Sequence, residues 1–501
     1  MDRKKKAALC AWILMAALGA FPQAAGAEDM DYRQTSWTSL AGKYENPYYI
    51  EKKGAALSPE LLSEWWTLFH DDTLEELIHL SLANNRDLVS AGGKLREARA
   101  AVGISKASRV PWLQAGAGWA RAEAPDTIVS DVTPSAMKKM PGMGIETDHN
   151  LSYAGIDASW EFDVWGKNRA KVKSSEYALS AREGMLYSTW VSISAEVAMN
   201  YITLRTLQEE LAVTEAHIKN QKENLNLLQV NEDKGLLSAL PADQASYTLH
   251  ESESKIPELK KDIAGTLNRI SILTGTIPGE LNEKLMKPAP LPEIDAELYN
   301  AVPADVLRQR PDVHAAEMAW LSQIAKTKEA RAELKPKFSI LGLLGFATLG
   351  GGLFSAGARA FGFTPSVTYP LFNGGALRKQ VEIQSARETE RQAEFENTVL
   401  KAAAEVRNSM TAVSQDKIRK DSLEQGRNKA KEALELSRNQ FHYGLSDYMG
   451  VLDAERHYLS LDQNYTLAKG QELTDMISLF KALGGGWKPL DERELAAAEV
   501  K

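Results

Sequence analysis

The chain has 501 residues, of which 44% are hydrophobic and 25% are charged, and its formal net charge is −8. That length accommodates two or three domains with enough apolar residues for a core. An acidic chain has no general electrostatic reason to bind nucleic acid or an anionic membrane face, so we expect no nucleic-acid partner. The only cysteine is Cys10, which excludes an intramolecular disulfide.

The first 27 residues have the pattern of a cleaved export signal. A basic cluster at 3–6 precedes an apolar run at 7–21, and small residues follow at 25–27. A membrane anchor is the less favoured interpretation, because the run has fifteen residues and a helix that crosses a bilayer needs about 20. Cleavage would leave 55 basic and 66 acidic residues, a net charge of −11.

The mature chain is expected to begin near Glu28 with an N-terminal extension over 28–74. Cys10 follows Leu9, where lipidation requires a small residue, and it precedes most of the apolar run. We therefore expect no lipid anchor.

Landmarks at fixed offsets predict an internal twofold repeat. Asp87 lies 24 residues before Pro111, and Asp312 lies 24 residues before Pro336. Four further pairs recur at an offset of 209 residues, namely Gly166 and Gly375, Glu196 and Glu405, Gly235 and Gly444, and Gly275 and Gly484. Recurrence of this kind is the signature of repeated structural units.

The two predicted copies span 75–284 and 285–488, and a C-terminal tail follows at 489–501. The first copy has 16 more residues than the second between its proline and the next matched glycine. They fall in the polar stretch 126–150, whose proline and glycine residues predict a surface loop.

Each copy predicts two strands, a long helix, a glycine turn and a second helix. These elements cover about 112–121, 151–164, 166–233 and 242–275 in the first copy, and about 337–346, 361–372, 376–442 and 447–483 in the second. Neither long helix contains proline, and at 1.5 Å per residue each would extend about 100 Å. In the second, Val399, Ala403, Val406, Met410 and Val413 step by four and three, which is typical of a coiled coil. An ordinary helical bundle is the alternative, although globular helices average only about a dozen residues.

The predicted strands alternate between apolar and polar residues, which places the two kinds on opposite sheet faces. We expect the apolar face to contact lipid through Ile156, Trp160, Phe162, Phe363, Val367 and Tyr369. We expect the polar face to line a lumen through Asp157, Ser159, Glu161, Thr364, Ser366 and Thr368. Four strands of about ten residues fit a transmembrane β-barrel; a half-buried soluble sheet has the same alternation.

A four-stranded sheet in lipid could not satisfy its own two edges, and each unpaired backbone group there costs several kcal/mol. Several copies must therefore join to close a barrel, and a barrel of about 8 strands leaves little room beyond its own side chains. A conducting pore thus favours three or more copies. The predicted fold is mainly α, with a transmembrane β-barrel to which each chain contributes four strands and which long coiled-coil helices extend as a tunnel.

Three motifs carry a family resemblance: RPDVHAAE at 310–317, YGLSDY at 443–448 followed by LDAER at 452–456, and LFKALGGGW at 479–487. Over about 60–488 the chain resembles the TolC-like outer-membrane efflux factors, in particular the OprM-like branch that serves resistance-nodulation-division pumps. The resemblance implies a homotrimer with a 12-stranded barrel in outer-membrane lipid. It also implies a periplasmic tip that opens when a periplasmic adaptor and an inner-membrane efflux transporter dock. Many such relatives carry a lipid-anchored N-terminal cysteine, which this chain lacks.

The resemblance also assigns two helix–turn–helix tips to adaptor docking. They comprise Gly235, Leu236, Leu237 and Ser238 in the first copy, and Gly444, Leu445, Ser446 and Asp447 in the second. Glycine permits a tight turn, and an exposed leucine offers apolar contact. The alternative is that the two glycines merely end helices.

Met449, Asp453 and Arg456 fall where the family has its periplasmic gate. Their spacings of four and three place them on one helix face. Threefold symmetry would bring Asp453 carboxylates together, and their repulsion would leave the closed state easy to unlock. The alternative is a surface ion pair between Asp453 and Arg456, worth a few tenths of a kcal/mol.

No residue pattern points to an enzyme. The eight histidines lack metal-ligand spacing, and the glycines at 350–352 lack the Lys-Ser/Thr of a phosphate loop, so we expect no metal and no cofactor. A periplasmic coiled-coil adaptor or structural protein is the main alternative function; it explains the long helices but not the aromatic strand faces. An uncoupled diffusion porin would need many strands per chain. We expect a passive exit duct for drugs or other small molecules in the outer membrane, with its helices in the periplasm.

Overall fold

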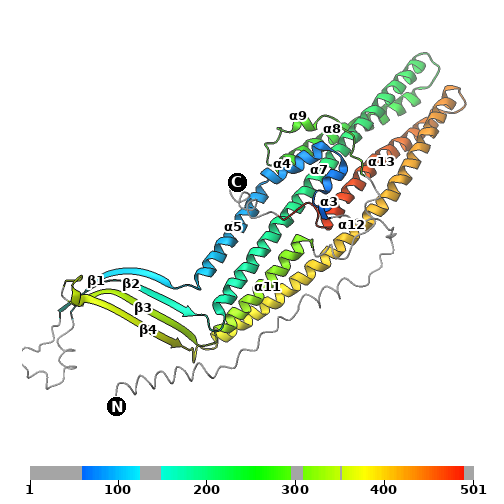
Figure 1. Ribbon diagram of the computed structural model, residues 1–501. Coiled ribbons are helices and arrows are strands. Elements are labelled where there is room, and N and C mark those ends of the chain that lie inside the picture. Colours follow the sequence, from blue (N-terminus) through cyan, green and yellow to red (C-terminus); the bar gives the residue numbers. More distant parts are fainter. Residues whose placement is uncertain (1–58, 124–147, 295–308, 350–351, 490–501) are drawn as a thin grey trace, which may run out of the picture. The chain divides into compact units, whose positions relative to one another are not determined.

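The computed structural model describes residues 59–123, 148–294, 309–349 and 352–489 (Figure 1). Its helices are α3 (Pro59–Ser63), α4 (Asp72–Asn84), α5 (Arg86–Ala107), α7 (Lys167–Asp233), α8 (Ala239–Thr274), α9 (Asn282–Leu285), α11 (Pro311–Ala332), α12 (Ala376–His442) and α13 (Tyr448–Ala482), with 3-10 turns η1 (Trp65–Phe69) and η4 (Ala356–Ala358). Its strands are β1 (Trp112–Glu123), β2 (Asp148–Phe162), β3 (Lys337–Leu349) and β4 (Arg359–Thr368). The predicted signal and nearly all of the predicted loop at 126–150 lie outside the described residues.

The four strands form one antiparallel sheet in the order β1-β2-β3-β4. Its central pairing, β2 with β3, joins the two halves of the chain. Ser159 lies opposite Trp112 on one side and Leu341 on the other, and Leu341 lies opposite Thr364. Because directly paired residues point to the same face, this register fixes the composition of both faces.

One face carries all six polar residues predicted to line a lumen, and the hydroxyls of Ser339 and Ser366 lie 2.7 Å apart on it. This face is less polar than predicted, because Trp112, Tyr153, Leu341 and Leu343 also lie on it and are each about half exposed or more. The β3 strand alternates weakly in sequence, with leucine on both faces, so its spacing did not reveal the two leucines.

The other face is apolar. It carries Leu113, Trp119, Ile156, Trp160, Phe162, Phe338, Ile340, Leu344, Phe361, Phe363, Pro365 and Val367. Phe361 and Phe363 are 88% and 70% exposed. Pro365 lacks a backbone N–H and lies in β4, which is an edge strand of the sheet within one chain.

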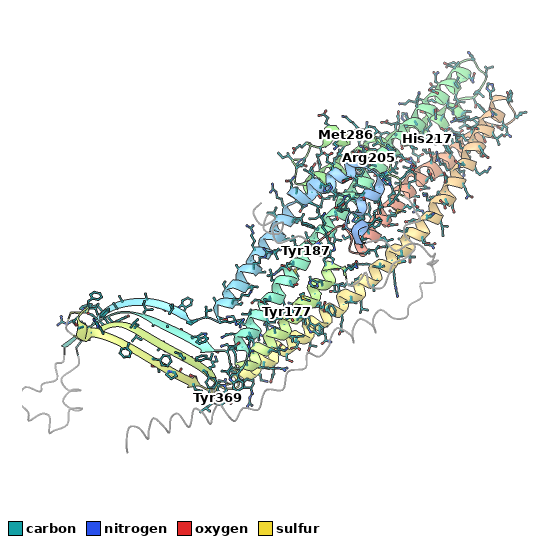
Figure 2. All side chains as sticks on the ribbon, viewed as in Figure 1. Tyr177, Tyr187, Arg205, His217, Met286 and Tyr369 are labelled. Atoms are coloured by element: carbon teal, nitrogen blue, oxygen red, sulfur yellow. The ribbon has the colours of Figure 1, made fainter. Side chains whose placement is uncertain are left out.

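Two predicted strand ends were wrong. β4 ends at Thr368, so Tyr369 follows the strand (Figure 2) instead of lying on its apolar face; the next residue, Pro370, cannot donate to the ladder. β2 ends at Phe162, because the Asp163 carboxylate accepts from the backbone N–H groups of Asn168 (2.9 Å) and Arg169 (2.8 Å) at the start of α7. Side-chain capping of a helix start ends the strand there.

α7 and α12 have 67 residues each, and at 1.5 Å per residue each extends about 100 Å. Each begins after a glycine with positive φ, Gly166 at +76° and Gly375 at +85°. α8 packs on α7 and α13 on α12, each pair joined by a short turn, while α5 and α11 pack against α7, and α11 also against α12. α13 also packs on α7, where Gly470 lies so close to Thr206 that a Cβ atom would overlap the threonine side chain.

The main core lies where the two ends of the described chain pack on α7 and α13. Trp65 stacks on Phe480 with ring centroids 5.3 Å apart, and the backbone N–H of Gly486 donates to Leu62 O at 3.0 Å. Trp487 stacks on Tyr187 of α7 at 4.6 Å. A smaller core near the turns contains Leu228, Ala242, Ala245, Leu434, Tyr448, Val451 and Leu452. None of the described helices has the length and apolar content needed to cross a bilayer.

Candidate functional site at the helical tips

The α7–α8 turn is the first of the two predicted docking tips. Gly235 has φ of +73°, a left-handed conformation that favours glycine. Its N–H donates to Glu232 O at 2.7 Å, and the N–H of Leu236 donates to Asn231 O at 2.9 Å. This pair of bonds is the Schellman pattern, which satisfies the last carbonyls of a helix.

The α12–α13 turn repeats this geometry. Gly444 has φ of +67°, and its N–H donates to Phe441 O at 3.0 Å while that of Leu445 donates to Gln440 O at 2.8 Å. Asp447 then begins α13, and its carboxylate accepts from the N–H of Gly450 at 3.3 Å. The glycines therefore do end helices, and the same turns leave their leucines projecting.

The tip leucines divide into exposed and packed residues. Leu236 and Leu445 are 70% and 77% exposed, whereas Leu237 packs against the smaller core. Ser238 begins α8 without a side-chain capping bond. The Ser446 hydroxyl is buried and has no hydrogen-bond partner among the described residues. Each turn thus exposes one leucine, next to the exposed side chains of Leu240 in the first tip and Tyr443 in the second.

The predicted gate residues Met449, Asp453 and Arg456 are all exposed on one face of α13. The alternative ion pair between Asp453 and Arg456 does not form. Asp453 instead approaches His457, with Oδ1 and Nε2 3.7 Å apart, and Arg456 forms no ion pair with any described residue. Residues at i+3 and i+4 are both neighbours on a helix surface, so the spacing allows either partner.

The opposite side of α13 makes a polar contact with α7 that sequence reasoning missed. Hydrogen bonds join Tyr448 with Asn224, Asp462 with His217, Gln463 with Thr214, and Lys469 with Glu209. Glu455 lies near Gln221, whose buried amide has no hydrogen-bond partner among the described residues. We call these ten residues the α7–α13 polar contact. Four of them recur every seven residues on α13, a spacing that could have identified them as one helix stripe.

Asp462 is the centre of this contact. Its carboxylate lies 3.0 Å from His217 Nε2 on α7 and 2.8 Å from Arg427 Nε on α12. Burial would raise the pKa of Asp462, but the His217 hydrogen bond and the Arg427 charge outweigh it, so the pKa lies below its usual value. Asp462 is therefore an anion that joins three helices.

Glu455, two turns closer to the tip, behaves in the opposite way. It is 3% exposed, and burial raises its pKa despite the nearby charges of Arg438 and His217. Burial also raises the pKa of Tyr448, whose hydroxyl accepts from the Asn224 amide. Polar groups in such a contact lose hydration without the packing gain of an apolar core, so separating α13 from α7 costs less free energy than separating apolar helices.

Metal binding has no support within the described ranges, since no three histidine, cysteine, aspartate or glutamate side chains there are grouped to hold an ion. Catalysis likewise has no assembled constellation among those residues. The described residues thus offer exposed turns, a polar contact between helices and a sheet with one apolar face.

Comparisons with known proteins show what this chain is similar to. The model of the outer membrane efflux protein family matches residues 77–276 and 302–485. The chain is 29% identical over 432 residues to TtgC of Pseudomonas putida, described as a probable efflux pump outer membrane protein, covering 84% of this chain and 85% of that protein. It is 24% identical over 462 residues to outer membrane protein OprJ of Pseudomonas aeruginosa, covering 90% and 93%.

Solved structures show the same fold. The outer-membrane channel OprN matches with a TM-score of 0.79 at 29% identity, over 89% of this chain and 99% of that one. VceC of Vibrio cholerae matches with a TM-score of 0.77 at 24% identity, over 85% and 99%, a likeness that concerns the fold alone. Because the family model covers well over half of the chain, this protein belongs to the outer membrane efflux protein family.

Proposed function

We propose that three copies of this chain close a 12-stranded barrel in the outer membrane, which continues into a helical duct on the periplasmic side. Each chain contains two copies of one structural unit, at 75–284 and 285–488, and both copies contribute to the wall of the duct. The long helices α7 and α12 are equivalent elements of these two copies. The chain reaches the periplasm through the cleaved signal at 1–27. The duct is the passive exit of a tripartite efflux system for small molecules.

The observation that carries this proposal is the sheet. Its apolar face exposes Phe361, Phe363 and Val367 to more than 60% each, which is too much contiguous apolar surface for a soluble monomer. The outer edges of β1 and β4 have no partner strand among the described residues. Pairing β4 of one copy with β1 of the next would satisfy both edges and place the apolar faces outward.

The tips support docking to a periplasmic adaptor. Leu236 and Leu445 are exposed apolar side chains on turns held by two backbone hydrogen bonds each. A preformed turn loses little conformational entropy on binding. The two turns therefore present similar exposed leucine side chains to the periplasmic adaptor.

Gating is supported by the α7–α13 polar contact. The α12–α13 pair can move away from α7 at a lower free-energy cost than an apolar contact would require. In a closed trimer Met449 and Asp453 would face the threefold axis, where three carboxylates repel one another. An adaptor that binds the tips more tightly in the separated state would open the duct.

Single-channel recording on the purified protein in planar bilayers tests the proposal. We expect discrete conductance steps from a species whose cross-linked mass is three chains, and a higher conductance for Asp453→Ala. A freely soluble monomer without conductance would contradict it and favour the coiled-coil adaptor.

A further inference from the structure

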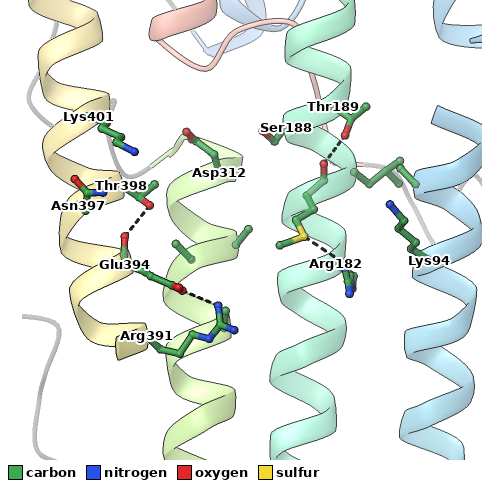
Figure 3. Close-up of a pocket in the computed structure, with 16 residues that line it drawn as sticks. Lys94, Arg182, Ser188, Thr189, Asp312, Arg391, Glu394, Asn397, Thr398 and Lys401 are labelled. Carbon is green, nitrogen blue, oxygen red and sulfur yellow. Dashed lines mark hydrogen bonds and ion pairs between the residues drawn. The ribbon is translucent and has the colours of Figure 1, made fainter. Parts of the chain in front are cut away.

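A cavity of about 660 Å³ lies on the helical wall and is lined by residues of α5, α7, α11 and α12 (Figure 3). Its apolar floor consists of Ala91, Met185, Leu186, Ala315, Ala316 and Ala319. The volume lies in the range of about 300–1,000 Å³ that is usual for small-molecule sites. None of the predicted tip, gate or sheet residues lines it.

The cavity is positively charged although the chain as a whole is acidic. Its lining contains four basic residues, Lys94, Arg182, Arg391 and Lys401, and two acidic ones. The net charge of the lining is therefore +2, in a chain of net charge −8. A concave surface of one sign concentrates ligands of the other sign.

Both acidic groups of the lining are already neutralised. Asp312 receives two hydrogen bonds from Arg310, at 3.0 and 2.7 Å. Glu394 accepts from Arg391 at 2.6 Å. These carboxylates are therefore occupied and do not compensate the remaining cations of the cavity.

Three cations remain available to a ligand. Lys94, Arg182 and Lys401 form no ion pair with any described residue. Arg182 donates a hydrogen bond only to the weakly accepting sulfur of Met185, at 3.5 Å, among the described residues. Figure 3 shows Lys401 reaching from α12 towards α11, across the floor from Lys94 on α5. Lys94 and Arg182 lie on neighbouring helices and form the rim that has no acidic lining residue.

Met185 of the cavity floor lies on the side of α7 opposite to the residues that contact the terminal segments. Tyr187 and Tyr201 of α7 contact Trp487 and Asp71 respectively. Met185 precedes Tyr187 by two residues, which is about 200° around a helix. A conducting duct cannot be filled by the aromatic terminal segments, so the proposed trimer has the Met185 side of α7 towards its interior.

We propose that this cavity is a binding site for amphiphilic organic anions, in which Lys94 and Arg182 hold a sulfonate or carboxylate and the alanine and methionine floor holds an aromatic or alicyclic body. An inorganic anion would not use the floor, and a neutral apolar compound would leave the cations without a partner. Methionine adapts to bodies of different shape. The site rests on the proposed function only for its access from the duct.

The test is calorimetric titration of the full-length protein in lipid nanodiscs with naphthalene-1-sulfonate, and in parallel with the neutral 1-naphthalenemethanol. We expect saturable binding of the anion, at one molecule per chain, and at least about tenfold weaker binding of the alcohol. Lys94→Gln and Arg182→Gln should each weaken anion binding about two- to fivefold, the usual worth of a solvent-accessible ion pair. Lys401→Gln, across the floor, should have a smaller effect.

The matched control is Lys431→Gln, which removes an exposed α12 cation about 45 Å along the helix from Lys401. It should leave anion affinity unchanged. Equal affinity for sulfonate and alcohol, or an unchanged affinity in the Lys94→Gln/Arg182→Gln double variant, would overturn the site. Conductance is recorded on the same variants, and its absence in the wild type would contradict the duct without altering the binding result.

Discussion

His217 Nε2 on α7 lies 3.0 Å from Asp462 Oδ2 on α13, and both side chains are about nine-tenths buried. This pair lies at the middle of the α7–α13 polar contact, where Arg427 also binds the same carboxylate. One buried carboxylate thus links α7, α12 and α13, in addition to the apolar core that these helices share.

Asp462→Ala should destabilise the helical part by about 3 kcal/mol, because it leaves a histidine and an arginine without their anion. The same loss should raise the open probability of the channel, since α13 is then held less firmly to α7. Thermal denaturation and single-channel recording measure the two effects. Glu432→Ala, at an exposed α12 position paired only with Lys429, should change neither; equal effects from both variants would show that the contact has no special role.

Asp475→Asn should flatten the dependence of thermal stability on pH. Burial, together with the hydrogen bond and charge of Asp416 on α12, raises the pKa of Asp475 to about 7. A carboxyl group whose folded pKa is raised contributes stability that is present below its ordinary pKa of about 4 and is lost as pH rises towards 7. The variant should therefore gain melting temperature relative to wild type at pH 8 and not at pH 4.

The control for Asp475→Asn, which lies on α13, is Asp421→Asn, a change of the same kind at an exposed position of α12. A melting-temperature difference for Asp475→Asn that stays constant from pH 4 to pH 8 would show that Asp475 does not titrate in this window.

Gly470→Ala should lower the melting temperature, because its Cβ would overlap Thr206 where α13 crosses α7. Overpacking of this kind usually costs about 1–3 kcal/mol. Gly265→Ala in α8, where a Cβ would meet nothing within 4 Å, should be neutral or stabilising through helix propensity. Adding Thr206→Ala should recover part of the loss in Gly470→Ala, and no recovery would place the strain elsewhere.

Phe363→Arg should impair assembly in lipid, whereas Thr364→Arg should be tolerated. The two residues are neighbours in β4 but lie on opposite faces, and arginine on a lipid face costs about 2–4 kcal/mol at the bilayer midplane. Folding yield into detergent-free liposomes, read by the shift of the unheated band in gel electrophoresis, compares them. Equal yields would contradict the assignment of the two faces.

Leu236→Ser combined with Leu445→Ser should weaken binding to the periplasmic adaptor about tenfold or more, because both exposed turn leucines are lost. Leu227→Ser, at an exposed α7 position before the turn, is the control and should leave affinity unchanged. Surface plasmon resonance with the immobilised protein measures the affinity of the wild type and of both variants. A tenfold loss in the control as well would point to general damage of α7.

The tip turns were accessible to sequence reasoning because glycine at 235 and 444 follows a long proline-free run. The gate face was likewise readable from the spacing of Met449, Asp453 and Arg456, although their role stays a prediction. The partner of Asp453 was not readable, since aspartate has an arginine at i+3 and a histidine at i+4. The structure shows that the partner of Asp453 is His457.

The sequence by itself determined the local elements, because strand alternation and helix length depend on residues that are neighbours in the chain. It thereby determined the two-faced sheet and the two 67-residue helices. The tertiary structure alone decided which helices meet: Asp462 with His217, Asp475 with Asp416, and the cations of α5, α7 and α12 around one cavity. Such contacts join residues far apart in sequence, and their free energy depends on the packing of whole helices, which no local spacing records.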